Sequence, residues 1–295
     1  MKNYSSLLII YNPNALKGKI DEHLPQIKQR LVLRYSVVDS MPTPKSGAED
    51  LAYKYANKYD IIVSCGGDGT LHQVVNGVMK SGASPLIGIL PFGSCNDVAR
   101  SLKIPFDETK AVDCLLRLNT TNYDIMFDGT EYLTYSLATG YLTQVGFSTP
   151  KKFKRKLGRF SYFLAGLTYI FKYPTLPLTI TCDGERIHGK FSYMMLINGE
   201  FAGGFNLNKG EDLSNGKVKL VLIKHEHGLM GWFSFIKMLL SGIKSVVKKK
   251  NVIVKDVTTV EIENHSNSTF SLDGEKSNFL KKKLSVNSTI RLIKK

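Results

Sequence analysis

The segment Cys65-Gly66-Gly67-Asp68-Gly69-Thr70 decides the fold of the first part of this chain. It follows the apolar run Asp60–Ser64, and it opens onto apolar residues at helical spacing that begin at Leu71. This order indicates a buried strand, a tight turn and a helix. Glycine lets backbone N–H groups approach an anion, and the dipole of the following helix favours negative charge. The segment therefore predicts a phosphate site, in which Asp68 suggests a Mg²⁺ held through water; an ordinary Asp-Gly turn is the alternative.

A second loop of the same kind follows the next apolar strand. Pro91-Phe92-Gly93-Ser94-Cys95-Asn96-Asp97 comes after Pro85–Leu90 and leads into another helical pattern. The carboxyl ends of neighbouring parallel strands meet at one edge of a sheet, where α/β proteins bind ligands. Ser94 and Asn96 can donate to phosphates, and Asp97 supplies a second carboxylate for a cation; a plain helix cap at Asn96 or Asp97 is the alternative. Together the two loops favour the phosphate site.

The wider pattern predicts two different architectures along the chain. Before about Asn122, apolar strands such as Ser6–Tyr11 alternate with helices such as those at 20–33 and 48–57, which is typical of a parallel α/β sheet. After Asn122, strand-like segments follow one another, which predicts antiparallel β structure with helices near 159–171 and 229–247. The turns between them are Asp128-Gly129, Asp183-Gly184, Asn215-Gly216 and Asp273-Gly274.

Composition excludes several classes of protein. The 295 residues are 43% hydrophobic and 22% charged, which is typical of a globular protein and excludes a disordered chain, a collagen and a coiled coil. The net charge of +15 predicts attraction to an anionic partner. No apolar stretch is long enough to span a membrane, and the apolar run near the N-terminus is too short for a signal peptide. We therefore expect a cytoplasmic protein with reduced cysteines, at most peripheral to a membrane.

The two loops resemble one known family. Gly66-Gly67-Asp68-Gly69-Thr70, followed by Pro91-x-Gly93-Ser94-x-Asn96-Asp97-x-Ala99-Arg100, is similar to the diacylglycerol kinase catalytic domain. The soluble bacterial lipid kinases are the nearest relatives, and sphingosine and ceramide kinases are more distant. The first loop is shared with NAD kinases and resembles that of phosphofructokinases, whereas the second is more specific to lipid kinases. The resemblance covers almost the whole chain through Asn12-Pro13-Asn14, Asn76-Gly77 and Leu272-Asp273-Gly274-Glu275.

The resemblance implies a fold, an activity and partners. Residues 1–124 would form a Rossmann-like α/β ATP-binding domain with a parallel sheet. Residues 125–280 would form an antiparallel β-sandwich for the lipid substrate, and 281–295 would return to the first domain. The protein would transfer the γ-phosphate of ATP, with Mg²⁺, to a lipid hydroxyl, and diacylglycerol giving phosphatidic acid is the first candidate. A peripheral position at an acidic membrane leaflet and a homodimer are further expectations.

The resemblance also implies roles for individual residues. Glu275 would be the general base, assisted by Asp68 and Asp97, which with Asp124 match a magnesium–water network. A second, structural Mg²⁺ would be held by Asp212, Asn215 and the backbone carbonyl of Lys217. The residues expected to bind ATP are Asn12, Pro13, Asn14, Ala15, Leu16, Thr43, Gly66, Gly67, Asp68, Gly69, Thr70, Leu71, His72, Ser94 and Asn96.

The chain departs from the family at three of these positions or beside them. Ser94 replaces a threonine but keeps its hydroxyl, and Gln73 stands where many members carry glutamate. Asn215 replaces an aspartate of the second metal site, which removes a charge and puts metal affinity there in doubt.

The residues by themselves do not select the base. Phosphoryl transfer needs positioning, charge neutralisation and a carboxylate near the attacking hydroxyl. Asp183-Gly184-Glu185 repeats the triplet Asp273-Gly274-Glu275, and Asp128-Gly129-Thr130-Glu131 is close to it. Each is adequately explained as a hairpin turn, and it is the resemblance that points to Glu275.

Two further patterns have simple explanations beside functional ones. His225-Glu226-His227 could bind a transition metal from one face of a strand, but a solvated strand end is the favoured interpretation. Basic clusters at 151–160, 248–250 and 281–283 could dock on an acidic leaflet, the first best because it interleaves lysines with Phe153 and Phe160. A solvated basic face is the alternative.

Other functions fit less well. A kinase of soluble substrates, of the NAD kinase kind, shares the first loop but not the form of the second. A nucleic-acid-binding module is suggested by charge alone, and no recognition motif for it occurs. A non-catalytic regulator on a kinase scaffold would be expected to lose Asp68, Asp97, Asp124 and Glu275, which this chain keeps.

Overall fold

The computed structural model describes residues 4–141, 175–225 and 230–295, and these form two compact units. Unit 1 is Met1–Ile125 together with Ser288–Lys295, and unit 2 is Met126–Asn287. Two strands, β5 (Thr120–Phe127) and β17 (Lys281–Ile293), carry the chain from one unit to the other. The return to unit 1 thus begins at 288, later than the expected 281. The expected helix at 159–171 and the basic cluster at 151–160 lie outside the described residues.

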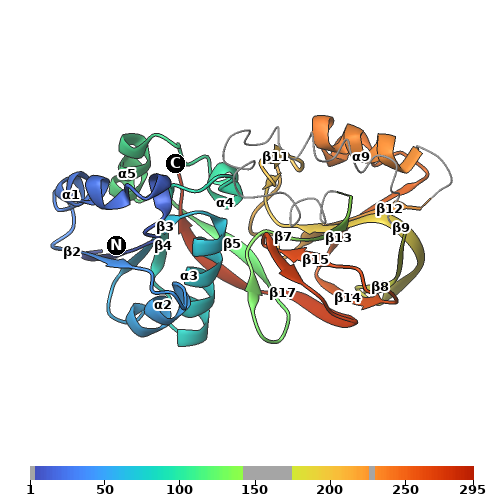
Figure 1. The fold of residues 1–295 in the computed structure, drawn as a ribbon, viewed down its shortest axis with the longest axis horizontal. Coiled ribbons are helices and arrows are strands. Elements are labelled where there is room, and N and C mark those ends of the chain that lie inside the picture. Colours follow the sequence, from blue (N-terminus) through green and yellow to red (C-terminus); the bar gives the residue numbers. More distant parts are fainter. Residues whose placement is uncertain (1–3, 142–174, 226–229) are drawn as a thin grey trace. The chain divides into compact units, whose positions relative to one another are not determined.

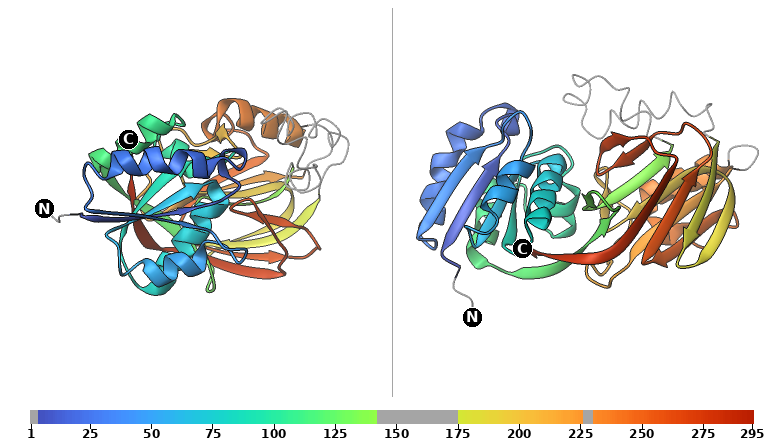
Figure 2. Two further views of the ribbon diagram at one scale, coloured as in Figure 1. Left: turned by 60° about the vertical axis from the view of Figure 1, so that its left-hand side comes forward. Right: turned by 90° about the horizontal axis from the view of Figure 1, so that it is seen from below.

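Unit 1 contains the expected parallel sheet, in the strand order β2-β1-β3-β4 with the end of β17 beside β4. Residues of β1, β3 and β4 are buried almost throughout, which explains their continuous apolar runs. Helices α1 and α5 pack together on one face of the sheet, and α2 and α3 pack together on the other (Figures 1 and 2). The elements are β1 (Ser6–Tyr11), η1 (Ala15–Lys17), α1 (Ile20–Leu31), β2 (Val37–Pro42), α2 (Glu49–Tyr55), β3 (Ile61–Gly66), α3 (Asp68–Ser81), β4 (Leu86–Pro91), α4 (Asp97–Ser101) and α5 (Glu108–Arg117).

Unit 2 is antiparallel, as expected, and is built around the long strand β9. Its strand order is β16-β15-β7-β9-β8-β14-β17, and β12 pairs with both β9 and β13. The elements are β6 (Tyr132–Leu133), β7 (Ser136–Gly140), β8 (Leu176–Cys182), β9 (Glu185–Ile197), β10 (Phe201–Ala202), β11 (Phe205–Asn206), β12 (Val218–Lys224), α9 (Met230–Ser241), η2 (Ile243–Ser245), β13 (Val252–Val257), β14 (Thr259–Asn264), β15 (Phe270–Leu272) and β16 (Glu275–Ser277).

The alternation of apolar residues along the strands of unit 2 gives it two hydrophobic clusters. On β12, Leu220 and Leu222 join the larger cluster, to which β7, β8, β9 and β14 also contribute, whereas Val221 and Ile223 belong to the cluster that α9 covers. This period of two follows from strand geometry. No helix of the described residues is long and apolar enough to span a membrane.

Three of the four expected Asp-Gly and Asn-Gly turns join paired strands. Asp183-Gly184 joins β8 to β9, and Asp273-Gly274 joins β15 to β16, in both cases with two residues at positive φ. Asp128-Gly129 connects β5 to β6. Asn215-Gly216 differs, because the strand before it, β11, pairs with β10 and not with β12. Asn215-Gly216 is therefore a turn within a loop and does not join two paired strands.

Candidate active site

The residues expected to bind ATP gather at one edge of the sheet of unit 1. The register places Tyr11 beside Pro42 and Cys65, and Gly66 beside Pro91, so all four parallel strands end together. The predicted nucleotide residues lie at or just after these strand ends: in the connecting loops, in η1, at the last residue of β3 and in the first residues of α3. This is the edge where open α/β sheets bind their ligands, because loops from neighbouring strands converge there.

The two glycine-rich loops touch through their backbones. A Cβ atom added to Gly93 would lie 2.3 Å from the Cα of Gly67, a distance that real structures do not tolerate. The N–H of Phe92 donates to the carbonyl of Gly66 at 2.8 Å. Glycine is therefore required at position 93 to let the second loop lie against the first.

Asp68 links the starts of two helices. Its Oδ1 accepts a hydrogen bond of 2.7 Å from the backbone N–H of Asp97, which is the first residue of α4. Asp68 is itself the first residue of α3, and Asp97 is buried. Two carboxylates thus lie in the first turns of adjacent helices, where the helix dipoles favour negative charge.

Asn96 has a different role from the predicted one. Its side-chain N–H groups donate to the carbonyls of Pro91 (3.1 Å) and Gly93 (2.9 Å), and its Oδ1 accepts from the N–H of Gly93 (3.1 Å). The residue is buried and has a left-handed backbone, with φ at 53°. Its amide therefore shapes the loop instead of facing a phosphate. Ser94, by contrast, is exposed at the tip of this loop.

The loop that follows β1 is hydrogen-bonded to β3 and folds back on itself. The N–H of Asn12 donates to the carbonyl of Cys65 at 2.9 Å, and the side-chain oxygen of Asn12 accepts from the N–H of Asn14 at 2.9 Å. Thr43 donates its N–H to the carbonyl of Tyr11. These bonds fix the segment 12–16 and Thr43 at the same edge as the glycine loops.

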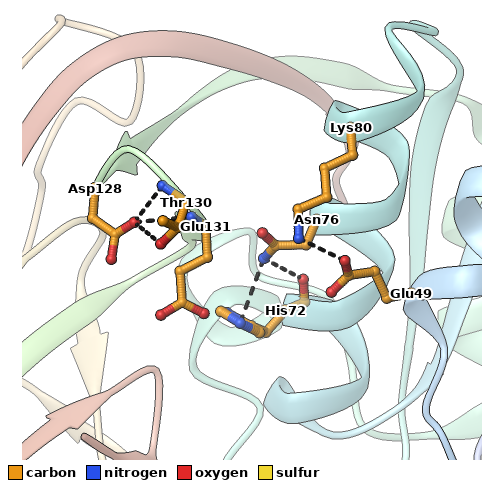
Figure 3. A network of polar contacts seen from close by, with 7 residues as sticks. All are labelled: Glu49, His72, Asn76, Lys80, Asp128, Thr130 and Glu131. Carbon is orange, nitrogen blue, oxygen red and sulfur yellow. Dashed lines mark hydrogen bonds and ion pairs between the residues drawn. The ribbon is translucent and has the colours of Figure 1, made fainter. Parts of the chain in front are cut away.

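Helix α3 carries a polar network that the sequence did not reveal. Asn76 donates to the backbone carbonyl of the buried His72, and Lys80 forms an ion pair of 2.7 Å with Glu49 of α2 (Figure 3). Gln73 accepts from the N–H of Ala48, just before α2, at 2.8 Å. Gln73, which stands where many family members carry glutamate, therefore links α3 to the start of α2.

The three acidic residues of the predicted magnesium network are not all brought together. Asp124 accepts a hydrogen bond of 2.9 Å from Thr289 of β17. Across residues 4–141, 175–225 and 230–295, no three His, Cys, Asp or Glu side chains form a group that could hold a metal. The magnesium–water network at Asp68, Asp97 and Asp124 therefore stays a prediction.

The donor set nevertheless fits Mg²⁺ in its usual mode. Protein-bound Mg²⁺ commonly takes one or two carboxylates, several waters and the phosphates of the substrate. Asp68 and Asp97, joined by a hydrogen bond at the loop edge, supply such a pair.

The predicted second metal site is a loop with local turns. Oδ1 of Asp212 accepts from the N–H of Ser214 at 3.0 Å, and Oδ1 of Asn215 accepts from the N–H of Lys217 at 2.9 Å. These bonds explain the loop without an ion, and a structural Mg²⁺ at Asp212, Asn215 and Lys217 stays a prediction.

In unit 2 the hairpin before Glu275 is clamped by a buried carboxylate. Asp273 accepts from the N–H groups of Tyr135 and Ser136 at 2.9 Å each, and from the N–H and hydroxyl of Thr134. Glu275 lies exposed at the start of β16, two residues beyond this clamp. Sequence reasoning missed Asp273, because its turn has the same letters as two others.

The other two Asp-Gly turns that could have supplied the base make structural contacts. Asp128 accepts from both Thr130 and Glu131 (Figure 3). It also forms an ion pair with Lys282. Glu185 forms an ion pair with Lys255. Among the three triplets that the sequence left open, these contacts argue against the Asp128 and Glu185 turns as the source of the base.

Within the described ranges, histidine adds no metal centre. Glu226 and His227 lie outside the described residues. His225 is hydrogen-bonded to Ser192 at 3.1 Å, in keeping with a strand-end residue.

Comparison with known proteins supports the lipid kinase resemblance. The family model of the diacylglycerol kinase catalytic domain matches residues 6–127. A diacylglycerol kinase of Staphylococcus haemolyticus is 30% identical over 270 residues, covering 90% of this chain and 81% of the relative. One from Staphylococcus aureus is 29% identical and is covered over 85% of its length. The crystal structure of a putative diacylglycerol kinase from Bacillus anthracis has the same fold, with a TM-score of 0.83 at 21% identity, covering 100% of this chain and 97% of that one.

Proposed function

The chain belongs to the diacylglycerol kinase family, and from that premise we propose that it transfers the γ-phosphate of ATP to the hydroxyl of diacylglycerol. The observation that carries the proposal is the contact of the two glycine loops, with Asp68 bonded to the N–H of Asp97 beside them. Converging N–H groups and helix starts suit a nucleotide triphosphate.

The parts of the site divide the work of phosphoryl transfer. The loops after β1, β3 and β4 bind and orient the phosphates, which is most of what this reaction requires. Bound Mg²⁺, held by Asp68 and Asp97 with the phosphates, would neutralise charge on the transferred group. Glu275, exposed on its clamped hairpin, accepts the proton of the attacking lipid hydroxyl.

The membrane is part of the proposal, because diacylglycerol is a lipid of the bilayer. The net charge of +15 favours an acidic leaflet over an uncharged one. A homodimer also stays a proposal.

The first test is phosphate transfer from Mg²⁺-ATP to a panel of lipids in mixed micelles, comparing the wild type with Glu275→Gln. Removing the base is expected to lower kcat by about 10²–10⁴-fold and to leave the free energy of unfolding unchanged, because Glu275 is exposed.

Glu185→Gln is the matched control, since Glu185 follows an identical Asp-Gly turn. Labelled phosphatidic acid from the wild type and the control, but not from Glu275→Gln, supports the proposal. Label on another lipid changes the substrate, and NADP formed from NAD, with no labelled lipid, overturns the proposal.

A further inference from the structure

Helix α9 is apolar on both of its sides. Its inner side faces the sheet of unit 2 and buries Phe235 and Met238. The ring centroid of Phe235 lies 5.1 Å from that of Tyr141 and 4.8 Å from that of Tyr193. This inner side covers the sheet face formed by β9, β12 and β13 (Figure 1). A surface helix of a water-soluble unit normally turns a polar side outward.

The outward side of α9 does not follow that rule. Met230 is 57% exposed, Phe233 55% and Leu240 74%. Together with Lys237 they define the outer face of α9, since positions 230, 233, 237 and 240 fall within about 80° of one another at 100° per residue. Lys237 is the one charged residue in the helix.

Exposed lysines follow the C-terminal end of α9. Lys244, Lys248 and Lys250 follow the helix closely and are exposed, and Val247 beside them is 48% exposed. In the part of the chain that the structure describes, neither these three lysines nor Lys237 is paired with a carboxylate. The outer face therefore offers apolar side chains together with Lys237 and, just after the helix, three further lysines that no carboxylate compensates.

We propose that the outer face of α9 docks on the surface of an anionic lipid bilayer. Large apolar side chains enter the interface between headgroups and acyl chains, and lysines at its margin bind anionic headgroups. This inference deepens the proposed function, because a lipid kinase must reach a substrate that resides in the bilayer. A symmetric contact with a second copy fits less well, since it would bring like charges together.

Cosedimentation with vesicles tests the docking surface without any measurement of activity. Phe233→Ser combined with Leu240→Ser is expected to weaken binding to phosphatidylglycerol–phosphatidylcholine vesicles by at least about tenfold. Val32→Ser combined with Leu33→Ser is the matched control, because these side chains are 55% and 82% exposed but lie beyond α1 in unit 1. Equal binding by wild type and the α9 variant would overturn the proposal.

Charge is tested separately. Lys237→Gln and Lys248→Gln are each expected to reduce binding to anionic vesicles by about fivefold, with no change on pure phosphatidylcholine. Lys110→Gln, an exposed lysine of α5, is the control and should bind as the wild type does. Equal losses in all three variants would show that only net charge matters, which contradicts a defined docking face.

The position of the helix can be observed directly. Trp232 of α9 is the single tryptophan of the chain, so its fluorescence reports on this helix. Because Trp232 packs partly buried against the inner cluster, Trp232→Phe combined with Phe233→Trp moves the indole to the outer face. Brominated acyl chains in the vesicles are expected to quench this indole, whereas binding without quenching would place another surface on the bilayer.

Two outcomes separate this inference from the proposed function. Activity on a water-soluble, short-chain diacylglycerol should be equal in wild type and the α9 double variant, while activity on vesicles falls only in the variant. Vesicle binding that depends on α9, with no lipid phosphorylated, would keep the docking surface and overturn the function. A stable dimer that the α9 variant converts to monomers would assign the face to a second copy and overturn the docking proposal.

Discussion

At the scale of single residues, carboxylates with similar sequence surroundings do different work. Asp273 and Asp128 each hold a turn by accepting from backbone N–H groups, whereas Asp68 joins two helix starts. Glu275 lies exposed beside one such turn. The chemistry of the acid is common to all of them, and its role is set by which donors the fold places within reach.

Asp273→Ala is expected to destabilise unit 2 and to impair catalysis together. The substitution leaves several buried N–H groups of residues 134–136 without an acceptor, at a cost of about 2–4 kcal/mol. Urea unfolding measures the stability, and kcat measures the displacement of Glu275. Asp273→Asn keeps one acceptor oxygen and should recover part of both; full activity in the alanine variant would contradict a positioning role.

The ion pair of Asp128 and Lys282 predicts a dependence of stability on pH. The Asp128 side chain is 1% exposed. Burial raises its pKa, but the Lys282 ammonium and two backbone N–H groups outweigh burial and lower the pKa to about 2. Because the folded-state pKa is depressed, the stabilisation is complete above the unfolded value of about 4 and is lost as pH falls towards 2.

Lys282→Gln should therefore lower the free energy of unfolding by about 1–2 kcal/mol at pH 6, and the difference from wild type should shrink towards pH 2. Urea unfolding at several pH values measures it. Lys281→Gln is the control, because Lys281 pairs with Glu261 at the surface, where such pairs contribute little. A difference that is constant with pH would contradict the assignment.

At the scale of elements, the active-site edge depends on turns that glycine permits. The two glycine loops approach so closely that a methyl group at position 93 would overlap the backbone of Gly67. Helices α3 and α4 begin directly after these loops, so a shift of one loop moves both helix starts.

Gly93→Ala is expected to abolish measurable ATP binding and to cost about 1–3 kcal/mol of stability through overpacking. Isothermal titration with ATP and thermal unfolding measure the two effects. Gly189→Ala of β9 is the control, since its added Cβ would meet Phe191 at an ordinary 3.5 Å. Unchanged ATP affinity in Gly93→Ala would show that the loops do not need this contact.

At the scale of the whole molecule, the C-terminal strand belongs to both units. β17 pairs with β14 in unit 2 and reaches β4 in unit 1, where Leu292 lies beside Ile87. Ile290, Leu292 and Ile293 are buried. The last residues of the chain therefore complete the core of the first domain.

A chain ending at Asn287 is expected to unfold in unit 1 while unit 2 stays folded. Three buried side chains contribute about 5 kcal/mol or more, which is comparable to the stability of a domain. Hydrogen exchange would show lost protection in β1 and β3 and retained protection in β12. Removal of Lys294 and Lys295, both exposed, is the control. Retained protection in β1 would contradict the role of β17.

The sequence by itself determined the α/β and antiparallel architectures and the family. An apolar strand, a glycine-rich turn and a helix follow one another twice, which shows where the loops 65–70 and 91–97 begin. Both loops together resemble one lipid kinase family closely enough to identify it. The period of two in unit 2 and the Asp-Gly turns likewise come from local backbone preferences, which neighbouring residues encode. In unit 1 the expected strands 6–11, 60–64 and 85–90 lie within a few residues of β1, β3 and β4.

The tertiary structure decided which polar groups meet. Asn96 turns inward to shape its loop, Asp273 reaches residues that are 137 to 139 positions away, and Asp124 bonds to Thr289 of the last strand. The outer face of α9 also needed the fold, since the sequence shows an apolar helix but not which side is covered. These contacts join residues far apart in the chain, and their partners depend on strand order and register, which local sequence patterns do not carry.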